Sequence, residues 1–297
     1  FIVILLFGLN KIYVPSSEWL SKDLDISMGY QGRQDDNGLY YVLDDEHQRL
    51  ICFDTEGNIR FTITNPSDKI SSGLYIDNFA VAKEGIYLAV TEWNEMLLAR
   101  EAVLFYNHEG QYVRTVTNRD YSELRTNKHR FQALESRDGE PHFIECMADE
   151  LVAGDQTIYY HNAFNAVCDA VYDGDVLYVM DKTGKITAFS GNGKKTVIYD
   201  KYPNEADLEP YRMCVDQEGT VFFTDIRNGT VRRVDPEGKM SSVVVDETAS
   251  LTVQKAQDGS FLLIEDGLLV KSEAGEREYI TLHKNSAQIA GQIVCIV

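Results

Sequence analysis

The residue types that most often perform catalysis are present in this chain, but their spacing matches none of the motifs that define a catalytic or metal site. The six histidines are scattered, no cysteines form a CxxC pair, and no histidine lies at ligand spacing from a cysteine. The chain also lacks G-x-S-x-G, H-E-x-x-H, a Gly-rich phosphate loop and an EF-hand pattern. We therefore predict no catalytic residue, no metal ligand and no cofactor.

Three aspartates recur at equivalent places, because Asp44, Asp181 and Asp225 each end a short apolar run. A carboxylate there can accept backbone N–H bonds from the turn that follows, and this is the role that we expect. A calcium ion held by such carboxylates is the alternative. The series is incomplete, since Thr91 and Glu265 stand at the corresponding positions of two other runs.

Ligand binding is a better-supported chemistry than catalysis. Trp93 lies in the segment TEWNEMLLARE, which is longer than its counterparts and which we expect to form an enlarged turn. An exposed Trp on an inserted loop is a binding candidate, although it can instead cover a neighbouring element. The full set of candidate ligand-binding residues is Trp93, Tyr211, Arg212, Asn78 and Asn165.

A repeat supplies the framework for these residues. An acidic or amide residue, a glycine and an apolar run of about five residues recur, and the glycines of the repeat are Gly38, Gly85, Gly139, Gly174, Gly219 and Gly259. Five of the six copies are followed by a second glycine turn and a second apolar run, as in VDPEGK after Thr230. Each unit therefore predicts four short antiparallel strands joined by glycine turns.

Four-stranded units that recur every 40 to 50 residues are typical of β-propeller blades. We predict an all-β propeller of about six four-stranded blades over residues 37–283, and five or seven blades also fit the sequence. Residues 11–36 are expected to form a linker that includes a ring-closing strand for the last blade. In this arrangement Tyr211 and Arg212 begin an inner strand and face the central channel.

The segments EGTVFFTDIRNGTVRRVDPEGK and NGLYYVLDDEHQRLICFDTEGN resemble NHL-type propeller repeats. The resemblance is good in the first and fifth units, fair in the fourth and weak elsewhere. It implies a fold and does not imply a chemistry. Some propeller enzymes of the lactonase or lyase kind hold a metal on the axis with carboxylates and Asn, and Asp77, Asn78, Asn165 and Asp169 are the residues that would do so here.

Both ends of the chain are apolar. Residues 1–10 (FIVILLFGLN) predict part of a transmembrane helix or a signal segment, and a buried strand is the alternative. Residues 284–297 predict a linker and the start of a second hydrophobic helix. An acidic domain between two membrane spans is most simply placed outside the cytoplasm.

The net charge of −19 disfavours nucleic acid as a partner, because such a surface repels phosphates. It is compatible with cationic ligands. The most basic segment, residues 118–132, is a candidate contact for an acidic partner or for a second copy of the chain. Cys52, Cys168 and Cys214 lie in apolar runs and are expected to be core residues.

These observations favour a binding module. We predict the extracytoplasmic sensor propeller of a membrane-anchored bacterial signalling protein, of the diguanylate cyclase or histidine kinase type, which binds a small molecule or a protein. Its membrane contact would be made by the terminal helices, and it could act as a homodimer. A propeller enzyme with an axial metal and a protein-interaction scaffold are the alternatives.

Overall fold

The computed structural model describes residues 26, 29–64, 66, 70, 73–94, 97–121, 130–135, 139–146, 150–153, 156–159, 167–200, 208–245, 252–255, 259–265, 268–273 and 276–280. The expected membrane or signal segment at 1–10, the expected second hydrophobic helix at 284–297 and Asn165 lie outside these ranges. Within them, no helix is long and apolar enough to cross a membrane.

The chain folds into six four-stranded antiparallel sheets, each made of four consecutive strands in sequence order. The first three sheets contain β1 (Gly29–Gln34), β2 (Tyr40–Asp44), β3 (Arg49–Phe53) and β4 (Ile59–Thr64); β5 (Leu74–Ala82), β6 (Gly85–Asn94), β7 (Leu97–Tyr106) and β8 (Tyr112–Asp120); and β9 (Arg130–Glu135), β10 (Pro141–Cys146), β11 (Glu150–Ala153) and β12 (Gln156–Tyr159).

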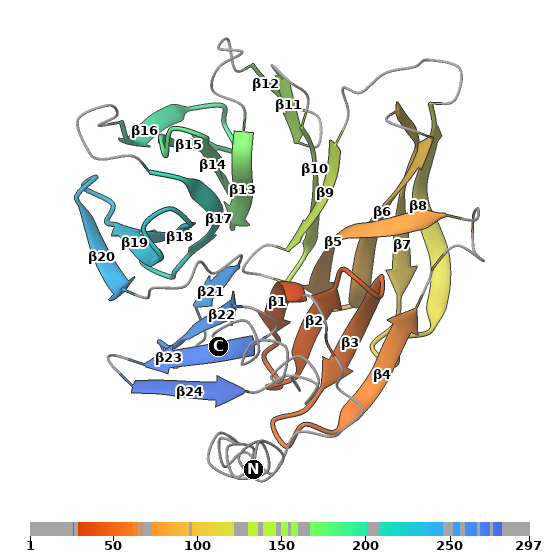
Figure 1. The fold of residues 1–297 in the computed structure, drawn as a ribbon. Helices are drawn as coiled ribbons and strands as arrows, with labels where there is room; N and C mark the ends of the chain where they lie inside the picture. The colour runs from red at the N-terminus through yellow and green to blue at the C-terminus, as the bar shows by residue number, and fades with distance from the viewer. Residues whose placement is uncertain are drawn as a thin grey trace, which may run out of the picture.

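The last three sheets contain β13 (Val167–Asp173), β14 (Val176–Asp181), β15 (Ile186–Ser190) and β16 (Lys195–Tyr199); β17 (Pro210–Val215), β18 (Val221–Asp225), β19 (Thr230–Val234) and β20 (Met240–Val245); and β21 (Val253–Lys255), β22 (Phe261–Glu265), β23 (Leu268–Glu273) and β24 (Glu276–Ile280). Figure 1 shows the sheets arranged around a common centre, with the first strand of each sheet innermost. The predicted all-β propeller arrangement is confirmed.

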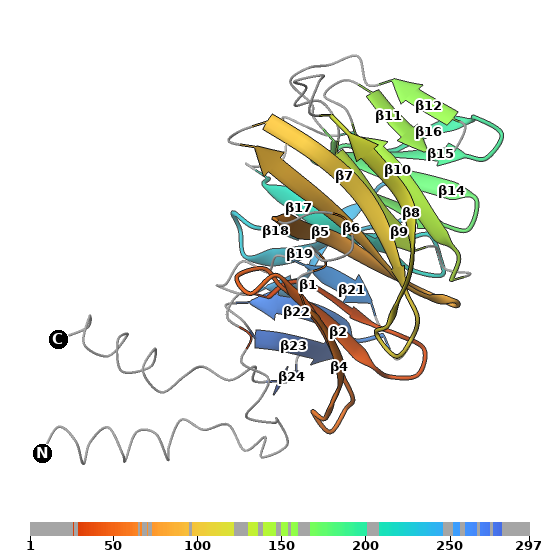
Figure 2. The same ribbon diagram turned by 90° about the vertical axis from the view of Figure 1, so that its right-hand side faces the viewer.

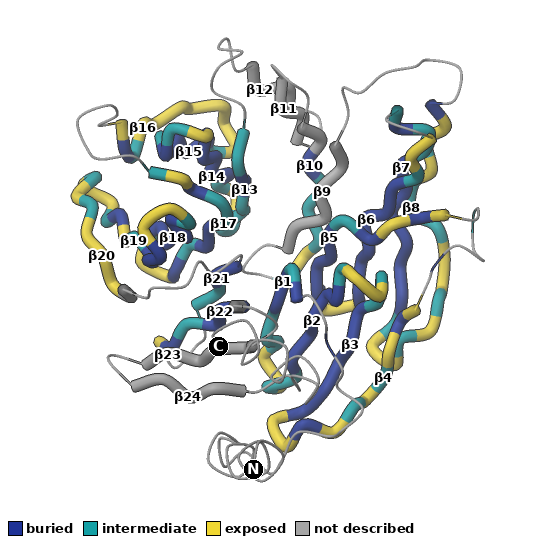
Figure 3. Tube along the Cα trace, in the orientation of Figure 1, coloured by how far each residue is buried: buried dark blue, intermediate teal, exposed yellow. Residues whose placement is uncertain are grey.

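The alternation of side chains along each strand explains why the sheets stack in a ring. In β2, Tyr41 and Leu43 pack toward the second sheet, whereas Tyr40 and Val42 pack toward the last one. Successive side chains of a strand point to opposite faces, so an apolar run without alternation buries both faces. Figure 3 shows the consequence, since β2 and β3 are buried while much of β4 and β20 is exposed.

Six hydrophobic clusters occupy the six interfaces between neighbouring sheets. The interface between the first and last sheets contains Phe53 and Ile51 packed with Leu262 and Ile264. The ring therefore closes by side-chain packing.

The segment expected to close the ring behaves differently from the prediction. Gly29–Gln34 forms β1 and pairs with β2 in the first sheet, so it adds no strand to the last sheet. Gln34 instead contacts Gln254 across the interface: the Gln34 N–H donates to the Gln254 Oε1 at 2.7 Å, and the Gln254 Nε2 donates to the Gln34 carbonyl at 3.1 Å. These two bonds connect the inner strands of the first and last sheets.

The expected enlarged turn around Trp93 is also corrected. Glu92, Trp93 and Asn94 are paired with Arg100, Leu98 and Leu97, so the additional residues lengthen a hairpin. Strands β6 and β7 have ten residues each, compared with five in β2 and β3. The side view in Figure 2 shows these long strands. The pairing of these additional residues continues the ladder beyond its usual length.

Candidate functional site

Two regions of the wheel collect the candidate residues. The first is the central channel, where residues of the inner strands meet around a cavity of about 10 Å³. The second is an open cleft of about 360 Å³ between the first and second sheets. Of the candidate residues, Asn78 and Arg212 line the channel cavity, whereas Trp93 lines the open cleft.

Asn78, Arg212 and Asp169 come together around the channel cavity. The remaining residues that line this cavity are Gln31, Arg33, Val171, Met213, Thr252 and Val253. A volume of about 10 Å³ is close to the smallest space that holds one water molecule. Among the described side chains, this cavity therefore has room for about one water molecule.

Arg212 is held by groups from three sheets. One guanidinium nitrogen lies 3.3 Å from Asp169 Oδ1 on β13, and another donates to the Tyr30 hydroxyl on β1 at 3.1 Å. The guanidinium also lies over the Tyr30 and Tyr211 rings, 5.5 and 5.4 Å from their centroids. Burial lowers the pKa of Arg212, but the opposing effect of Asp169 and the two tyrosines is larger and leaves its pKa above the usual range. Arg212 therefore stays charged, and its guanidinium occupies part of the channel.

Tyr211 adds a further contact between the sheets around Arg212. Its hydroxyl donates to the Tyr30 hydroxyl at 2.9 Å, which links the first and fifth sheets. The other Asp169 oxygen accepts the Met213 backbone N–H at 2.8 Å. These bonds satisfy both ends of an ion pair that would otherwise be costly to bury. Tyr211 and Arg212 accordingly hold sheets together, and neither projects into an open ligand pocket.

The described channel residues do not assemble the axial metal site of the enzyme alternative, and Asn165 lies outside the described ranges. Asp169 already binds a guanidinium and a backbone N–H. Asp77, a second proposed ligand, lines the outer cleft and is not among the residues around the channel cavity. In the part of the chain that the structure describes, no three His, Cys, Asp or Glu side chains cluster as metal ligands.

Asn78 is the exception among the channel residues. It is 4% exposed, and its Oδ1 has no hydrogen-bond partner within the described ranges. Nearby, Gln31 exchanges two bonds with the Phe79 backbone, at 3.1 and 3.2 Å, which join the first and second sheets.

The three strand-ending aspartates have mixed roles. Asp181 Oδ1 accepts the backbone N–H groups of Thr183 and Lys185, as predicted. Asp225 instead binds the Arg232 guanidinium at 2.9 Å, and Asp44 binds the Arg49 guanidinium at 3.0 Å. In both cases the arginine comes from the next strand of the same sheet, which places a buried carboxylate beside a fixed positive charge.

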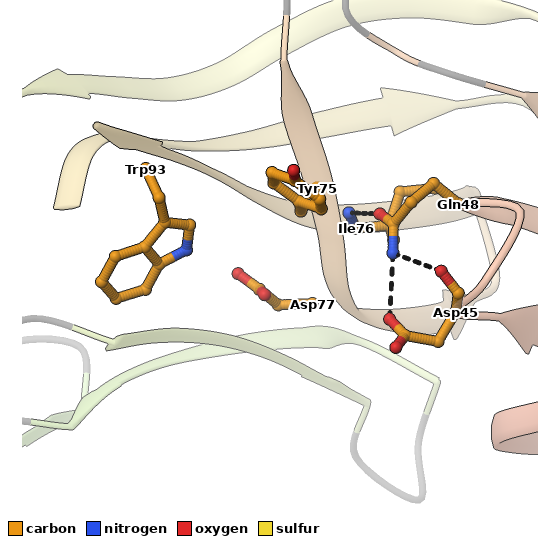
Figure 4. A pocket seen from close by; sticks show the side chains of 6 residues that line it. All are labelled: Asp45, Gln48, Tyr75, Ile76, Asp77 and Trp93. Carbon is orange, nitrogen blue, oxygen red and sulfur yellow. Dashed lines mark hydrogen bonds between the residues drawn. The ribbon is translucent and has the colours of Figure 1, made fainter. Parts of the chain in front are cut away.

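The open cleft is the more suitable place for a ligand. Its lining consists of Asp45, Gln48, Tyr75, Ile76, Asp77 and Trp93. These residues come from the β2–β3 turn, from the beginning of β5 and from the end of β6 (Figure 4). Turns between second and third strands and the entry into inner strands lie at the same end of such sheets, so the cleft opens on one face of the wheel.

Trp93 and Tyr75 are unusually exposed among the described aromatic residues, at 45% and 50%. The Trp93 indole N–H donates to the Thr91 hydroxyl at 3.0 Å, which restrains the ring. Figure 4 shows the Asp77 carboxylate directed toward the indole. Trp93 was a candidate from its sequence context, whereas Tyr75 was not, because a single Tyr at the start of an inner strand has no distinguishing pattern.

Gln48 organises the other side of the cleft. Its backbone has φ of 48°, the only described non-glycine residue with positive φ. Its Nε2 donates to the Asp45 carbonyl and to Asp45 Oδ1, at 2.7 and 2.9 Å, and its Oε1 accepts the Ile76 N–H at 2.6 Å. A strained backbone of this kind persists only where its surroundings hold it. Gln48 therefore fixes Asp45 relative to β5.

The fold and the cleft together define a β-propeller with a ligand-sized cleft on one face. Solved structures of this fold are similar to the chain. The match to a streptogramin B lyase (12% identity, TM-score 0.58) covers 91% of this chain and 87% of the lyase chain. A gluconolactonase of Xanthomonas campestris (14% identity, TM-score 0.56) covers 82% and 85%. The extracellular domain of a hybrid two-component system of B. thetaiotaomicron (15% identity, TM-score 0.53) covers 90% of this chain and 35% of its own.

At these identities the similarities show the fold alone. No family model matches the chain, and no curated protein matches it in sequence. The NHL resemblance therefore stays a prediction.

Proposed function

We propose that this chain is an extracytoplasmic sensor propeller, anchored to the membrane, that binds a small molecule and passes the signal to an attached output domain of the cyclase or kinase type. The observation that carries the proposal is the cleft on the face of the wheel. It is open and of ligand size, and the pocket volumes of small-molecule sites begin at about 300 Å³.

Two further observations support a sensor. The described lining of the cleft offers carboxylates, an amide and aromatic rings, which bind ligands, and it contains no pair of nucleophile and base. One similar structure is the extracellular domain of a hybrid two-component system, which supports a sensor role for this fold. In the mechanism that we propose, the ligand binds the signalling state more tightly than the resting state and shifts the equilibrium between them.

Location is the most direct test of this proposal. Lys194 lies on the exposed β15–β16 turn, and a Lys194→Cys variant of the chain provides one reactive thiol there. Cys52 and Cys214 are buried, and burial raises the pKa of each thiol to about 12, so both are poor competitors for a maleimide. We expect a membrane-impermeant maleimide to label the variant in intact bacteria, above the background of the unsubstituted chain, and the protein to stay with the membranes after an alkaline wash. Labelling that requires cell lysis, or release by the wash, would contradict the proposal.

The second candidate function is a propeller enzyme, which the similarity to a lyase and to a gluconolactonase favours. The occupied channel argues against an axial metal in this chain. Metal analysis of the purified protein separates the two candidates, because one calcium ion per chain would support the enzyme.

A protein-interaction scaffold is the remaining alternative. It would use the basic segment 118–132, of which residues 122–129 lie outside the described ranges. Pull-down with and without this segment tests it.

A further inference from the structure

The cleft has a chemical bias that narrows the class of its ligand. Asp45 and Asp77 place two carboxylates on its walls, and none of its six lining residues is basic. The chain also carries a net charge of −19, so its long-range field attracts cations and repels anions. Charge alone would fit a metal ion, an amine or a basic side chain.

The aromatic walls favour an organic cation. Trp93 and Tyr75 expose about half of their surface, and indole is the side chain that binds a cation over its face most strongly. Figure 4 shows Asp77 directed toward the indole, so a cation between them would lie beside an aromatic ring and a carboxylate together. A hydrated metal ion gains little from such a ring, whereas an ammonium or guanidinium group with an apolar arm gains from both.

Size leads to the same conclusion. The cleft measures about 360 Å³, which is many times the share of about 30 Å³ that one water molecule occupies in the liquid. It is at the small end of the range for organic ligands. A molecule of the size of an amino acid or a short polyamine fits this volume.

The site is also prepared before a ligand arrives. Gln48 holds Asp45 at 2.9 Å and β5 at 2.6 Å, and Thr91 holds the indole N–H at 3.0 Å. Groups that are already fixed lose less conformational entropy on binding. Gln48, which makes two of these contacts, has a left-handed backbone with φ of 48°.

We infer that this cleft binds a small organic cation, with a primary ammonium or guanidinium group between Asp77 and Trp93 and an apolar arm against Tyr75. The inference rests on the proposed binding function and specifies the ligand class. Agmatine is a suitable probe because it carries both kinds of cationic group on a short apolar chain. Its matched controls are 1,4-butanediol, which is neutral, and glutarate, which is anionic.

The measurement uses the indole N–H signals of the intact chain in ¹⁵N-correlated NMR spectra. The chain has only two tryptophans, Trp19 and Trp93, and the Trp93→Phe variant assigns the signals. We expect agmatine to shift the Trp93 signal in a saturable way and to leave the Trp19 signal in place, whereas the diol and glutarate have no effect. The apparent Kd should rise with salt, because the contact is ionic.

Asp77→Asn is the decisive variant, since it removes one charge and keeps the shape. We expect it to raise the Kd for agmatine about tenfold or more, as the loss of a charge-assisted bond predicts. Asp175→Asn, at an exposed turn between β13 and β14, is the matched control and should leave the Kd unchanged.

The outcomes separate this inference from the proposed function. A Trp93 shift by glutarate or the diol, or an equal Kd in Asp77→Asn, overturns the cation class while the cleft remains a binding site. If agmatine shows no shift and no saturation, the cation class is likewise overturned, and labelling of Lys194→Cys in intact cells would still support the sensor. If the Trp93 shift is found but labelling requires lysis, the cation site stands and the extracytoplasmic sensor falls.

Discussion

At the scale of single residues, buried carboxylates stabilise this fold mainly by binding the chain around them. Asp216 is 9% exposed and accepts the N–H groups of Glu218 and Thr220, at 3.0 and 2.9 Å. It also binds Lys255 of the next sheet at 3.0 Å. Burial alone would raise the pKa of Asp216. The Lys255 bond and the backbone bonds lower this pKa by more than burial raises it, so the net pKa lies below the ordinary 3.8.

This depressed pKa predicts a dependence of stability on pH. Because the carboxylate is more acidic in the folded state, its contribution is fully present above about pH 3.8 and is lost as the pH falls below that value. Replacing Asp216 with Ala should lower the free energy of unfolding by about 2 kcal/mol near pH 7. The difference from the parent protein should shrink as the pH is lowered toward 3.

Urea denaturation at several pH values measures the free energy of unfolding and so tests this prediction. Asp235→Ala is the matched control, because Asp235 accepts the Lys239 N–H at 2.7 Å in an equivalent but more exposed turn. It should cost less stability than Asp216→Ala. A loss in Asp216→Ala that stays constant between neutral and acidic pH would show that the ionised carboxylate is not the source.

Residue patterns predicted only some of the site. The strand-ending position of Asp181 predicted its turn bonds, and the inner-strand position of Arg212 predicted its place at the channel. The ion pair of Arg212 with Asp169 joins residues 43 positions apart, and such a pairing is set by the ring and not by local sequence. Gln48 and Tyr75 escaped prediction for the same reason, since the cleft exists only where two sheets meet.

At the scale of elements, the glycine turns were the most predictive feature. All six first glycines of the repeat have positive φ, from 56° at Gly174 to 151° at Gly85. The strand order within each sheet then followed from short connections between consecutive apolar runs. Gly29–Gln34 was expected to lie in a segment that adds a strand to the last sheet, and its polar sequence GYQGRQ does not indicate that it pairs with β2.

Two glycines of the repeat should respond differently to the same substitution. A methyl group on Gly85 would lie 2.2 Å from the Tyr106 carbonyl oxygen, in addition to the strain of its positive φ. Gly174 has φ of 56° and nothing within 4 Å of the added atom. We therefore expect Gly174→Ala to cost about 1 kcal/mol of unfolding free energy and Gly85→Ala about 3 kcal/mol.

Thermal and urea unfolding of the two variants compares these costs. Gly174→Ala is the control for backbone strain without a clash. Equal losses would mean that the Gly85 backbone moves to accept the methyl group, and that the close approach of β6 to β7 is not required.

At the scale of the whole molecule, the ring explains why the centre and the face have different functions. Six hydrophobic interfaces close the wheel, and the polar inner strands must then satisfy each other in a narrow channel. Arg212, Asp169, Tyr30 and Tyr211 do so, and they leave about 10 Å³. The face carries the longer hairpin of β6 and β7, which forms a wall of the open cleft. The sequence predicted the wheel but left binding candidates both at the channel and on the Trp93 segment, because repeat spacing reveals the strands and not how the inner side chains pair.

The claim that the cleft, and not the channel, is the ligand site is open to direct observation. Crystals of the chain soaked with a mixed set of small cations, anions and neutral molecules would show by diffraction where compounds bind. We predict electron density for cationic compounds between Trp93 and Asp77, with the Arg212–Asp169 pair unchanged. Density for a compound beside Arg212 in the channel, with the cleft left empty, would contradict the account.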